Sequence, residues 1–217
     1  MKRDGWRRII LETRSPAAAQ HSESYYSIFS HFPGLKGVCP SDAYTAKGLL
    51  AACIRDDDPV VFFEHKGLYG ISGPVPEEPY VLPIGKARTI REGADVTLVG
   101  ISKMTWVAND AAEALAKEGI DCEVIDLLSV SPIDYDHINE SVRKTNRLVV
   151  VDEDTPVCSM ASEICSRVAE EVFDYLDAPP SRVTAPHTPV PYSRAMENEY
   201  MPNETRVINT VKNLLNR

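Results

Sequence analysis

The 217-residue sequence lacks any apolar run long enough to cross a lipid bilayer. Its longest apolar stretches, such as residues 60–63, are far shorter than the roughly 20 residues that a membrane-spanning helix needs. The basic residues at the start are not followed by the apolar segment of a secretory signal. We therefore expect a protein that is neither inserted in a membrane nor exported, and that works in the cytoplasm.

Paired cysteines and an excess of basic residues are also absent. The five cysteines are scattered and odd in number, which argues against a disulfide framework and against a zinc site of paired cysteines. We expect them to be reduced and buried. Only 23 Lys and Arg stand against 32 Asp and Glu, and the resulting net charge of -9 has the wrong sign for a protein that binds nucleic acid.

The composition is that of a folded protein, with 43% hydrophobic and 25% charged residues. A chain of this length fits one large domain or two small ones. Residues 67–83 contain four prolines and three glycines, which exclude a helix or an inner strand. We therefore predict a first lobe over residues 1–69, a Pro-rich linker over residues 70–82 and a second lobe over residues 83–217.

The second lobe alternates short β-branched runs with amphipathic stretches, a pattern typical of helices packed on a parallel sheet. Strands are expected at residues 96–101, 122–126, 148–152 and 182–184, and helices at residues 102–118, 134–144, 160–173 and 203–215. Ser102 is the predicted N-cap of the first of these helices, and Gly119 is its predicted end. The sequence thus predicts an α/β protein.

The first lobe contains one clear helix and one clear strand. Ser41 is the predicted cap of a helix that ends near Arg55, and Pro59 precedes a strand at residues 60–64. One such unit cannot bury both faces of its strand. We therefore expect the remainder of a larger sheet, with an open edge at this strand and other strands missing or supplied by another chain. The first 18 residues are predicted to be irregular.

Several short motifs occur in an order that is familiar from one protein family. They are AQHSES at 19–24, HFPGLK at 31–36, AKGLL at 46–50, IRDDDPVV at 54–61, GKA at 85–87, REGADVT at 91–97 and RLVVVDE at 147–153. On these motifs the sequence resembles the beta subunit of thiamine-diphosphate-dependent 2-oxo acid dehydrogenases, the E1 components of the pyruvate, branched-chain and acetoin complexes. Segments 152–161 and 183–192 are most similar to the acetoin branch.

The resemblance covers nearly everything from Ala19 to the C-terminus. It implies a truncated pyrimidine-binding-type αβ segment followed by a transketolase C-terminal-like parallel-sheet domain. It also implies cleavage of a 2-oxo acid such as pyruvate, or of acetoin, with acyl transfer to lipoamide. The implied cofactor is thiamine diphosphate with Mg²⁺, held mainly by an E1 alpha subunit. The other implied partners are a second beta subunit and the E2 acyltransferase core.

The resemblance assigns a catalytic role to His21. Thiamine chemistry moves protons around a charged intermediate, and an imidazole can donate or accept a proton near neutral pH. From sequence alone, a single histidine before a helix is more often an N-terminal cap or a surface residue than a catalytic residue. The family match of the surrounding motif favours the catalytic alternative.

The segment at residues 53–59 ends a helix just before a proline, which leaves the last carbonyls without partners inside the helix. Those carbonyls and the helix dipole attract a cation, although a hydrated acidic helix end is the simpler alternative. The resemblance implies a structural potassium ion bound mostly by backbone oxygens. The predicted ligands are Cys53, Ile54, Asp56 and Asp58.

The sequence departs from the family pattern at its N-terminus. Family members are longer there and carry a glutamate that activates the cofactor, for which this chain offers no candidate. We therefore expect an N-terminally shortened relative whose isolated chain is inactive. The alternatives are a catalytically incompetent α/β assembly module, and a transketolase-type C-terminal fragment.

Overall fold

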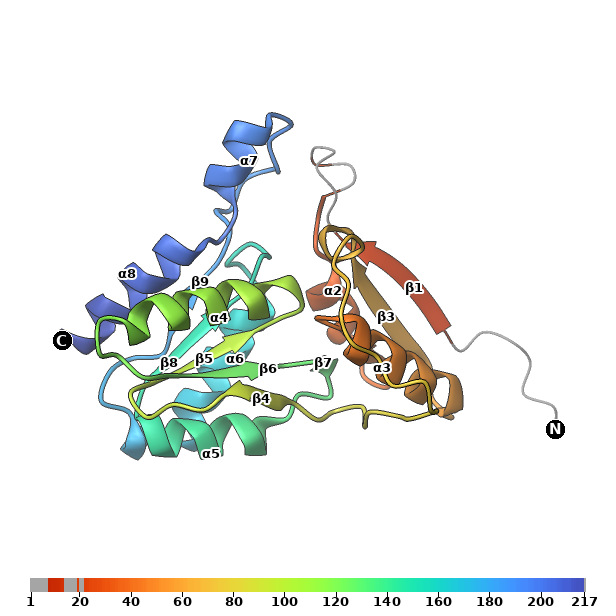
Figure 1. Ribbon diagram of the computed structural model, residues 1–217, viewed down its shortest axis with the longest axis horizontal. Helices are drawn as coiled ribbons and strands as arrows, with labels where there is room; N and C mark the ends of the chain where they lie inside the picture. The colour runs from red at the N-terminus through yellow and green to blue at the C-terminus, as the bar shows by residue number, and fades with distance from the viewer. Residues whose placement is uncertain (1–7, 14–18, 20–21, 217) are drawn as a thin grey trace.

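The structure is a computed structural model that describes residues 8–13, 19 and 22–216. Two β-sheets lie next to each other, each with its own helices (Figure 1). The first sheet has the strand order β1 (Arg8–Thr13), β3 (Val60–His65), β2 (Lys36–Val38) and β7 (Ser129–Ser131). The second has the order β4 (Arg88–Arg91), β6 (Cys122–Asp126), β5 (Val96–Gly100), β8 (Leu148–Val151) and β9 (Ser181–Val183).

The first sheet corrects two predictions. Strand β1 lies within the first 18 residues, which were expected to be irregular, and pairs in parallel with β3. Strand β3 therefore lies between β1 and β2, so the open edge predicted at this strand is wrong. The other edge is formed by β7, which comes from the second lobe and pairs antiparallel with β2. A three-residue strand so distant in sequence leaves no periodic signal of its own.

Helix α3 (Ala43–Arg55) covers one face of the first sheet, where Leu49 packs on Val60 and Phe62. Its N-cap is Asp42, so the predicted cap Ser41 is wrong. The carboxylate of Asp42 accepts from the backbone N–H of Thr45 at 2.7 Å, and the Thr45 hydroxyl accepts from the backbone N–H of Asp42. This reciprocal capping box satisfies two donors at the start of the helix.

The second sheet follows the predicted pattern and adds to it. Strands β6, β5, β8 and β9 are parallel, and all four residues of β8 have 0% exposure, as expected for an inner strand. The predicted helices are confirmed as α4 (Lys103–Ala116), α5 (Tyr135–Thr145), α6 (Met160–Glu171) and α8 (Glu204–Leu215). The antiparallel edge strand β4 and the short helix α7 (Arg194–Tyr200) were not predicted.

Ser102 is the N-cap residue of α4, as predicted, but its side chain does not cap the helix. Ser102 has a positive φ of 52° and makes no side-chain capping bond, because its hydroxyl donates to the carbonyl of Pro40 at 2.9 Å. Gly100 precedes it, and a side chain there would lie 2.3 Å from the Cα of Thr105. A glycine is needed for this close approach of strand and helix. At the other end, Gly119 has the predicted left-handed conformation.

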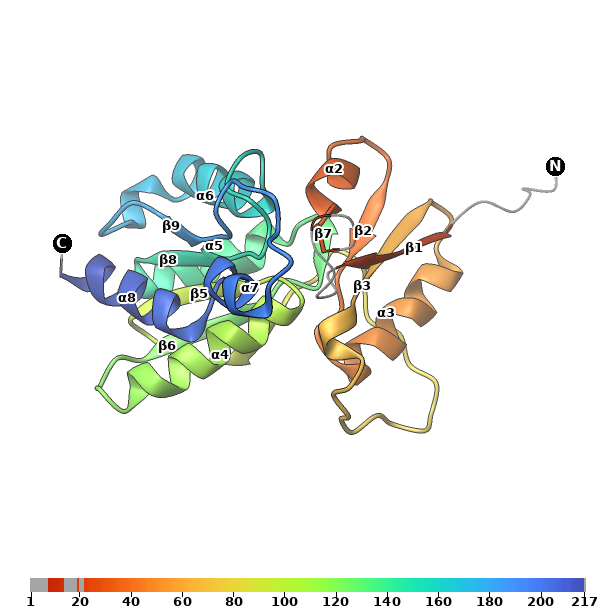
Figure 2. The ribbon, with the colours of Figure 1, turned by 90° about the horizontal axis from the view of Figure 1, so that it is seen from above.

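The main core joins the two sheets. The face of the first sheet opposite α3 contributes Phe63, which meets the ring of Tyr26 edge to face, with centroids 6.0 Å apart. Tyr26 begins helix α2 (Tyr26–Ser30), and the same cluster includes Val99 and Ile125 of the second sheet. Figure 2 shows α2 and β7 next to this junction. The two sheets therefore bury one shared layer of apolar side chains.

Three further expectations can be compared with the fold. Cys39, Cys53 and Cys122 are buried as expected, but Cys158 is exposed and Cys165 is partly exposed, and none of these five described cysteines forms a disulfide bond. No helix in the described part of the chain has the length and apolar character to span a membrane. Residues 70–82 form no helix or strand. The lobe boundaries stay a prediction, because β7 lies beyond the linker and yet completes the first sheet.

Candidate functional site

The candidate site lies at the carboxyl ends of the parallel strands in the second sheet. In open α/β sheets this edge forms the crevice in which ligands bind. Here, the residues that end or follow three neighbouring strands all contact the first lobe. They are Asp126 at the end of β6, Ser102 after β5 and Asp152 after β8. The crevice is therefore filled by the chain's own polypeptide.

These contacts form a junction between the two lobes, and Asp126 lies at one end of it. It has 0% exposure and accepts from the hydroxyl of Ser41 at 2.5 Å and from Nε of Arg88 at 3.0 Å. Arg88 also donates to Asp42 at 2.7 Å, which connects strand β4 to the cap of α3. Burial raises the pKa of Asp126 to about 6, although the Arg88 guanidinium acts in the opposite direction. This end is a charged network around a buried carboxylate.

Asp152 forms the other end and is also fully buried. Its carboxylate accepts from the hydroxyl of Tyr26 and from the backbone N–H groups of Asp154 and Ala161, at 3.0 and 3.1 Å. Burial raises the pKa of Asp152 to about 7, which outweighs the opposing effect of these hydrogen bonds. The donors at this end are a phenol and two backbone amides, none of which carries a positive charge. The negative charge of the ionised Asp152 carboxylate is therefore poorly compensated.

Glu153 joins the two lobes next to Asp152. Its side chain accepts from the hydroxyl of Ser24 at 2.5 Å and lies 2.8 Å from Nε2 of His65. The other ring nitrogen of His65 accepts from the backbone N–H of Gly67 at 3.0 Å. Because Nδ1 is an acceptor, a neutral ring carries its proton on Nε2 and donates it to Glu153. The arrangement assigns this tautomer to His65.

His21, the predicted catalytic residue, lies outside the described residues, so its role stays a prediction. The next residue in the chain, Ser22, has 0% exposure, and Ser24 is held by Glu153. His65 was not predicted to be a site residue. Its position at the carboxyl edge of a parallel strand is a signal, but its partner Glu153 is 88 residues away.

The predicted potassium ligands lie at the end of α3. Cys53 is buried, Ile54 is exposed, and Asp56 is the C-cap. The carboxylates of Asp56 and Asp58 pair with the ammonium of Lys36, at 2.9 and 3.1 Å. Burial alone would raise the pKa of Asp56, but hydrogen bonds from Lys36 and from the backbone N–H of Asp58 lower it below the ordinary value. Ion binding by the backbone carbonyls stays a prediction.

Metal ligation by side chains finds no support in the parts of the chain that the structure describes. These contain no group of three or more His, Cys, Asp or Glu side chains arranged to hold a metal ion. The sequence prediction places the potassium ion mostly on backbone oxygens, so this observation does not test it.

An apolar groove of about 440 Å³ lies beside the junction, between α2 and the loop after β8. Four large apolar side chains that line it are at least 40% exposed: Tyr25, Ile28, Phe32 and Val157. Single exposed apolar residues are common, but a cluster around a groove is typical of a surface that another molecule covers. We refer to it as the α2 groove.

Two family models match the chain. The description "Transketolase, pyrimidine binding domain" matches residues 11–72, and "Transketolase, C-terminal domain" matches residues 85–207. The second match covers more than half of the chain, which therefore belongs to the transketolase C-terminal domain family. The predicted α/β fold class, with its pyrimidine-binding-type segment and parallel-sheet domain, is confirmed.

The relatives refine this classification. The chain is 51% identical over 199 residues to the beta subunit of acetoin:2,6-dichlorophenolindophenol oxidoreductase from Bacillus subtilis. This match covers 92% of this chain and 58% of the relative. It is 47% identical over 198 residues to the beta subunit of the pyruvate dehydrogenase E1 component from Rickettsia felis. This match covers 91% of this chain and 61% of the relative. The resemblance to E1 beta subunits is confirmed.

The coverage of the relatives is partial. The chain spans a little more than half the length of these two proteins. Among solved structures, it is similar to "Split gene transketolase, inactive beta4 tetramer", with a TM-score of 0.80 and 23% identity. That match covers 96% of this chain and 66% of the other. At this identity, the structural similarity establishes the fold alone.

Proposed function

We propose that the chain acts as the beta subunit of a thiamine-diphosphate-dependent enzyme of the 2-oxo acid and acetoin dehydrogenase type, together with an alpha-type subunit. The observation that carries the proposal is the anchoring of the segment after His21. Ser24 is bound to Glu153, and Tyr26 to Asp152, in a buried junction between the lobes. Such anchoring suits a residue that must be held in one position for catalysis.

Thiamine diphosphate, when bound, supplies a carbanion that adds to the carbonyl of the substrate. The part of this chain is to present the imidazole of His21, which donates or accepts a proton near neutral pH. Gly67 lies in the single-turn 3-10 helix Lys66–Leu68 after β3, and Gly70 and Gly73 lie in the irregular segment that follows. The three glycines therefore do not form the strand-to-α-helix turn of a phosphate cradle. The proposal therefore places the diphosphate and Mg²⁺ on the alpha-type subunit. It also expects the isolated chain to be inactive.

The α2 groove is the surface on which the proposal places the alpha-type subunit. It adjoins the segment that follows His21. Its exposed apolar side chains Ile28, Phe32 and Val157 would be buried in the interface of an assembled enzyme. A second beta-type chain and an acyltransferase core complete the proposed assembly. The proposal also includes the potassium ion at the end of α3.

The proposal is tested by co-expression with an alpha-type subunit. We expect reduction of 2,6-dichlorophenolindophenol that requires thiamine diphosphate and either acetoin or pyruvate. Substituting His21→Ala should lower turnover by at least 100-fold, on the order of a lost general acid or base. His187→Ala, at an exposed histidine between β9 and α7, is the matched control and should retain turnover. Unchanged turnover in His21→Ala would contradict the proposed role.

The second candidate function is that of an assembly module without catalysis. One observation favours it: the crevice of the second sheet is filled by the chain's own residues, among them Tyr26 and His65. The same co-expression separates the two functions. Stable co-purification with the alpha-type subunit but no turnover supports the assembly module. Turnover that depends on His21 supports the enzyme.

A further inference from the structure

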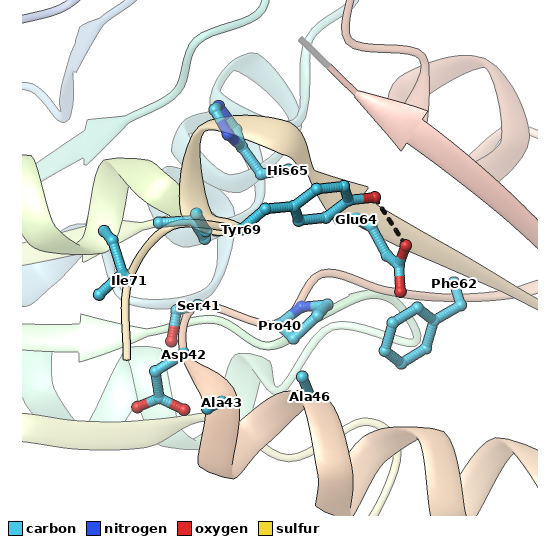
Figure 3. A pocket seen from close by; sticks show the side chains of 11 residues that line it. Pro40, Ser41, Asp42, Ala43, Ala46, Phe62, Glu64, His65, Tyr69 and Ile71 are labelled. Atoms are coloured by element: carbon cyan, nitrogen blue, oxygen red, sulfur yellow. Dashed lines mark hydrogen bonds between the residues drawn. The ribbon is translucent and has the colours of Figure 1, made fainter. Parts of the chain in front are cut away.

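A second pocket, of about 220 Å³, opens in the first lobe (Figure 3). Pro40, Ala43 and Ala46 line it at the start of α3, and Ile71, at the start of the linker, lines it from a separate segment of the chain. Residues 71–79 are all exposed and form no helix or strand. The path of the linker therefore sets one wall of this pocket. None of the proposed functions uses the linker.

The linker is held on α3 by the side chain of Lys47. The ammonium of Lys47 donates to three consecutive backbone carbonyls, those of Pro76, Glu77 and Glu78, the last two at 3.3 and 3.1 Å. An ammonium group has three donors and no acceptor. The three carbonyls therefore use all of its donors, and each bond is strengthened by the positive charge.

The next residues of the linker pack on the same face of α3. The ring of Tyr80 stacks on that of Tyr44, with centroids 4.8 Å apart, and its hydroxyl donates to the Tyr44 carbonyl at 2.7 Å. The backbone N–H of Leu82 donates to the carbonyl of Gly48 at 3.1 Å. A side chain at Gly48 would lie 2.6 Å from that of Leu82, so a glycine permits this close approach. The second half of the linker therefore lies along α3 as a strap.

The two contacts of the strap differ in exposure. The carbonyls that Lys47 binds belong to exposed residues, so water can replace the ammonium without leaving a buried polar group unpaired. Leu82, by contrast, packs partly buried against the apolar cluster that includes Leu49. Segments with few buried contacts open locally at a smaller free energy than global unfolding. The contact at Lys47 is therefore the one that can open while the fold persists.

We propose that Lys47 is a latch that holds the linker closed on α3. When the ammonium is removed, residues 71–79 open locally, and the pocket loses the wall that Ile71 contributes. The lobes stay together, because the buried junction at Asp126 and Asp152 is separate from the strap. The latch is a conformational device within the first lobe, and it requires no partner chain.

Cleavage by a protease specific for glutamate measures the latch. Within the linker, the bond between Glu77 and Glu78 is the one site for it, because Pro79 follows Glu78 and blocks cleavage there. The Glu77 carbonyl, which the protease attacks, is one of the three that Lys47 binds. Cleavage therefore requires the strap to open, and its rate reports the population of the open form. Cleavage after the exposed Glu199 of α7 is the internal reference.

The decisive variant is Lys47→Met, which keeps an apolar stem and removes the ammonium. It should raise the rate of cleavage at Glu77, relative to that at Glu199, by at least about tenfold, because hydrogen bonds to a charged group are lost. The matched control is Lys117→Met, at an exposed lysine after α4, and its cleavage rates should match those of the unsubstituted chain. Equal rates in Lys47→Met and the unsubstituted chain would overturn the proposal.

Urea unfolding of the same variants separates local opening from a loss of global stability. The midpoint for Lys47→Met should stay close to that of the unsubstituted chain, since the lost contact is exposed. A midpoint that falls in step with the rise in cleavage would show that the whole chain unfolds, and it would contradict the latch. These measurements use the full chain without an alpha-type subunit and without turnover. Their outcome is therefore independent of the proposed enzymatic function.

Discussion

The two ends of the lobe junction bury a carboxylate in different ways. Asp126 is paired with the guanidinium of Arg88, whereas Asp152 receives a phenol and two backbone N–H groups. Burial raises the pKa of both carboxylates, to about 6 and about 7. A cation close to a buried acid reduces the cost of its charge, and Asp126 has such a cation, whereas Asp152 lies near the further carboxylate of Asp154, which raises its pKa. The Asp152 end of the junction should therefore be more sensitive to pH.

The largest expected effect is the dependence of stability on pH. A carboxyl whose pKa is raised on folding stabilises the folded state while it is protonated, and this contribution is lost as the pH rises through the folded pKa. For Asp152 the loss should occur between about pH 4 and pH 7, and the shift sets an upper limit of about 4 kcal/mol. Urea unfolding at a series of pH values measures it.

Asp152→Asn is the variant that isolates this effect. The amide cannot ionise, so the free energy of unfolding should lose most of its decline between pH 6 and pH 7. Asp126→Asn is the comparison, since the part due to Asp126 should be complete by about pH 6. If Asp152→Asn keeps the decline above pH 6, another group is responsible for it.

The next largest effect is expected at the charged end. Arg88→Met leaves Asp126 buried without its cation and should lower the free energy of unfolding by about 3 kcal/mol. Arg88 is partly exposed, which places the expectation at the lower end of the range for broken buried pairs. Lys117→Met removes an exposed cation at the end of α4 and is the control. A loss no larger than that of Lys117→Met would remove the distinction between the two ends.

The smallest effect concerns Glu153. Ser24→Ala removes one of the donors to its carboxylate and should cost about 1 kcal/mol at neutral pH. Ser27→Ala removes a comparable bond to Asp154, which is only partly buried, and should cost less. The measurement is again urea unfolding. Equal losses in the two serine variants would mean that burial of Glu153 does not strengthen its bond to Ser24.

The secondary structure of the second lobe was predictable because its signals are local. A helix such as α5 has apolar residues with helical periodicity, and Gly119 ends α4 by a rule that involves only neighbouring residues. The cap predicted at Ser41 is wrong, and Ser102 is the predicted N-cap residue but makes no side-chain capping bond; both results have a nonlocal cause. Their hydroxyls donate to Asp126 and to the carbonyl of Pro40, more than 60 residues away in each case.

The candidate site was predictable only in part. The motif around His21 indicated the correct family, because it occurs together with several other short motifs in the order that is typical of that family. The pairing of His65 with Glu153 and the contribution of β7 to the first sheet were not predictable. Each depends on two segments from different lobes, and nothing in either segment alone identifies the other.

The sequence by itself determined the α/β class, the family, the helices and most strands of the second lobe, since these depend on periodicity, turn residues and ordered motifs. Only the tertiary structure decided which buried carboxylates meet which donors, and that the crevice of the second sheet is filled by Tyr26 and His65. The physical reason is that buried polar groups must find partners wherever the fold places them. Those partners are set by the packing of the two lobes and not by proximity along the chain.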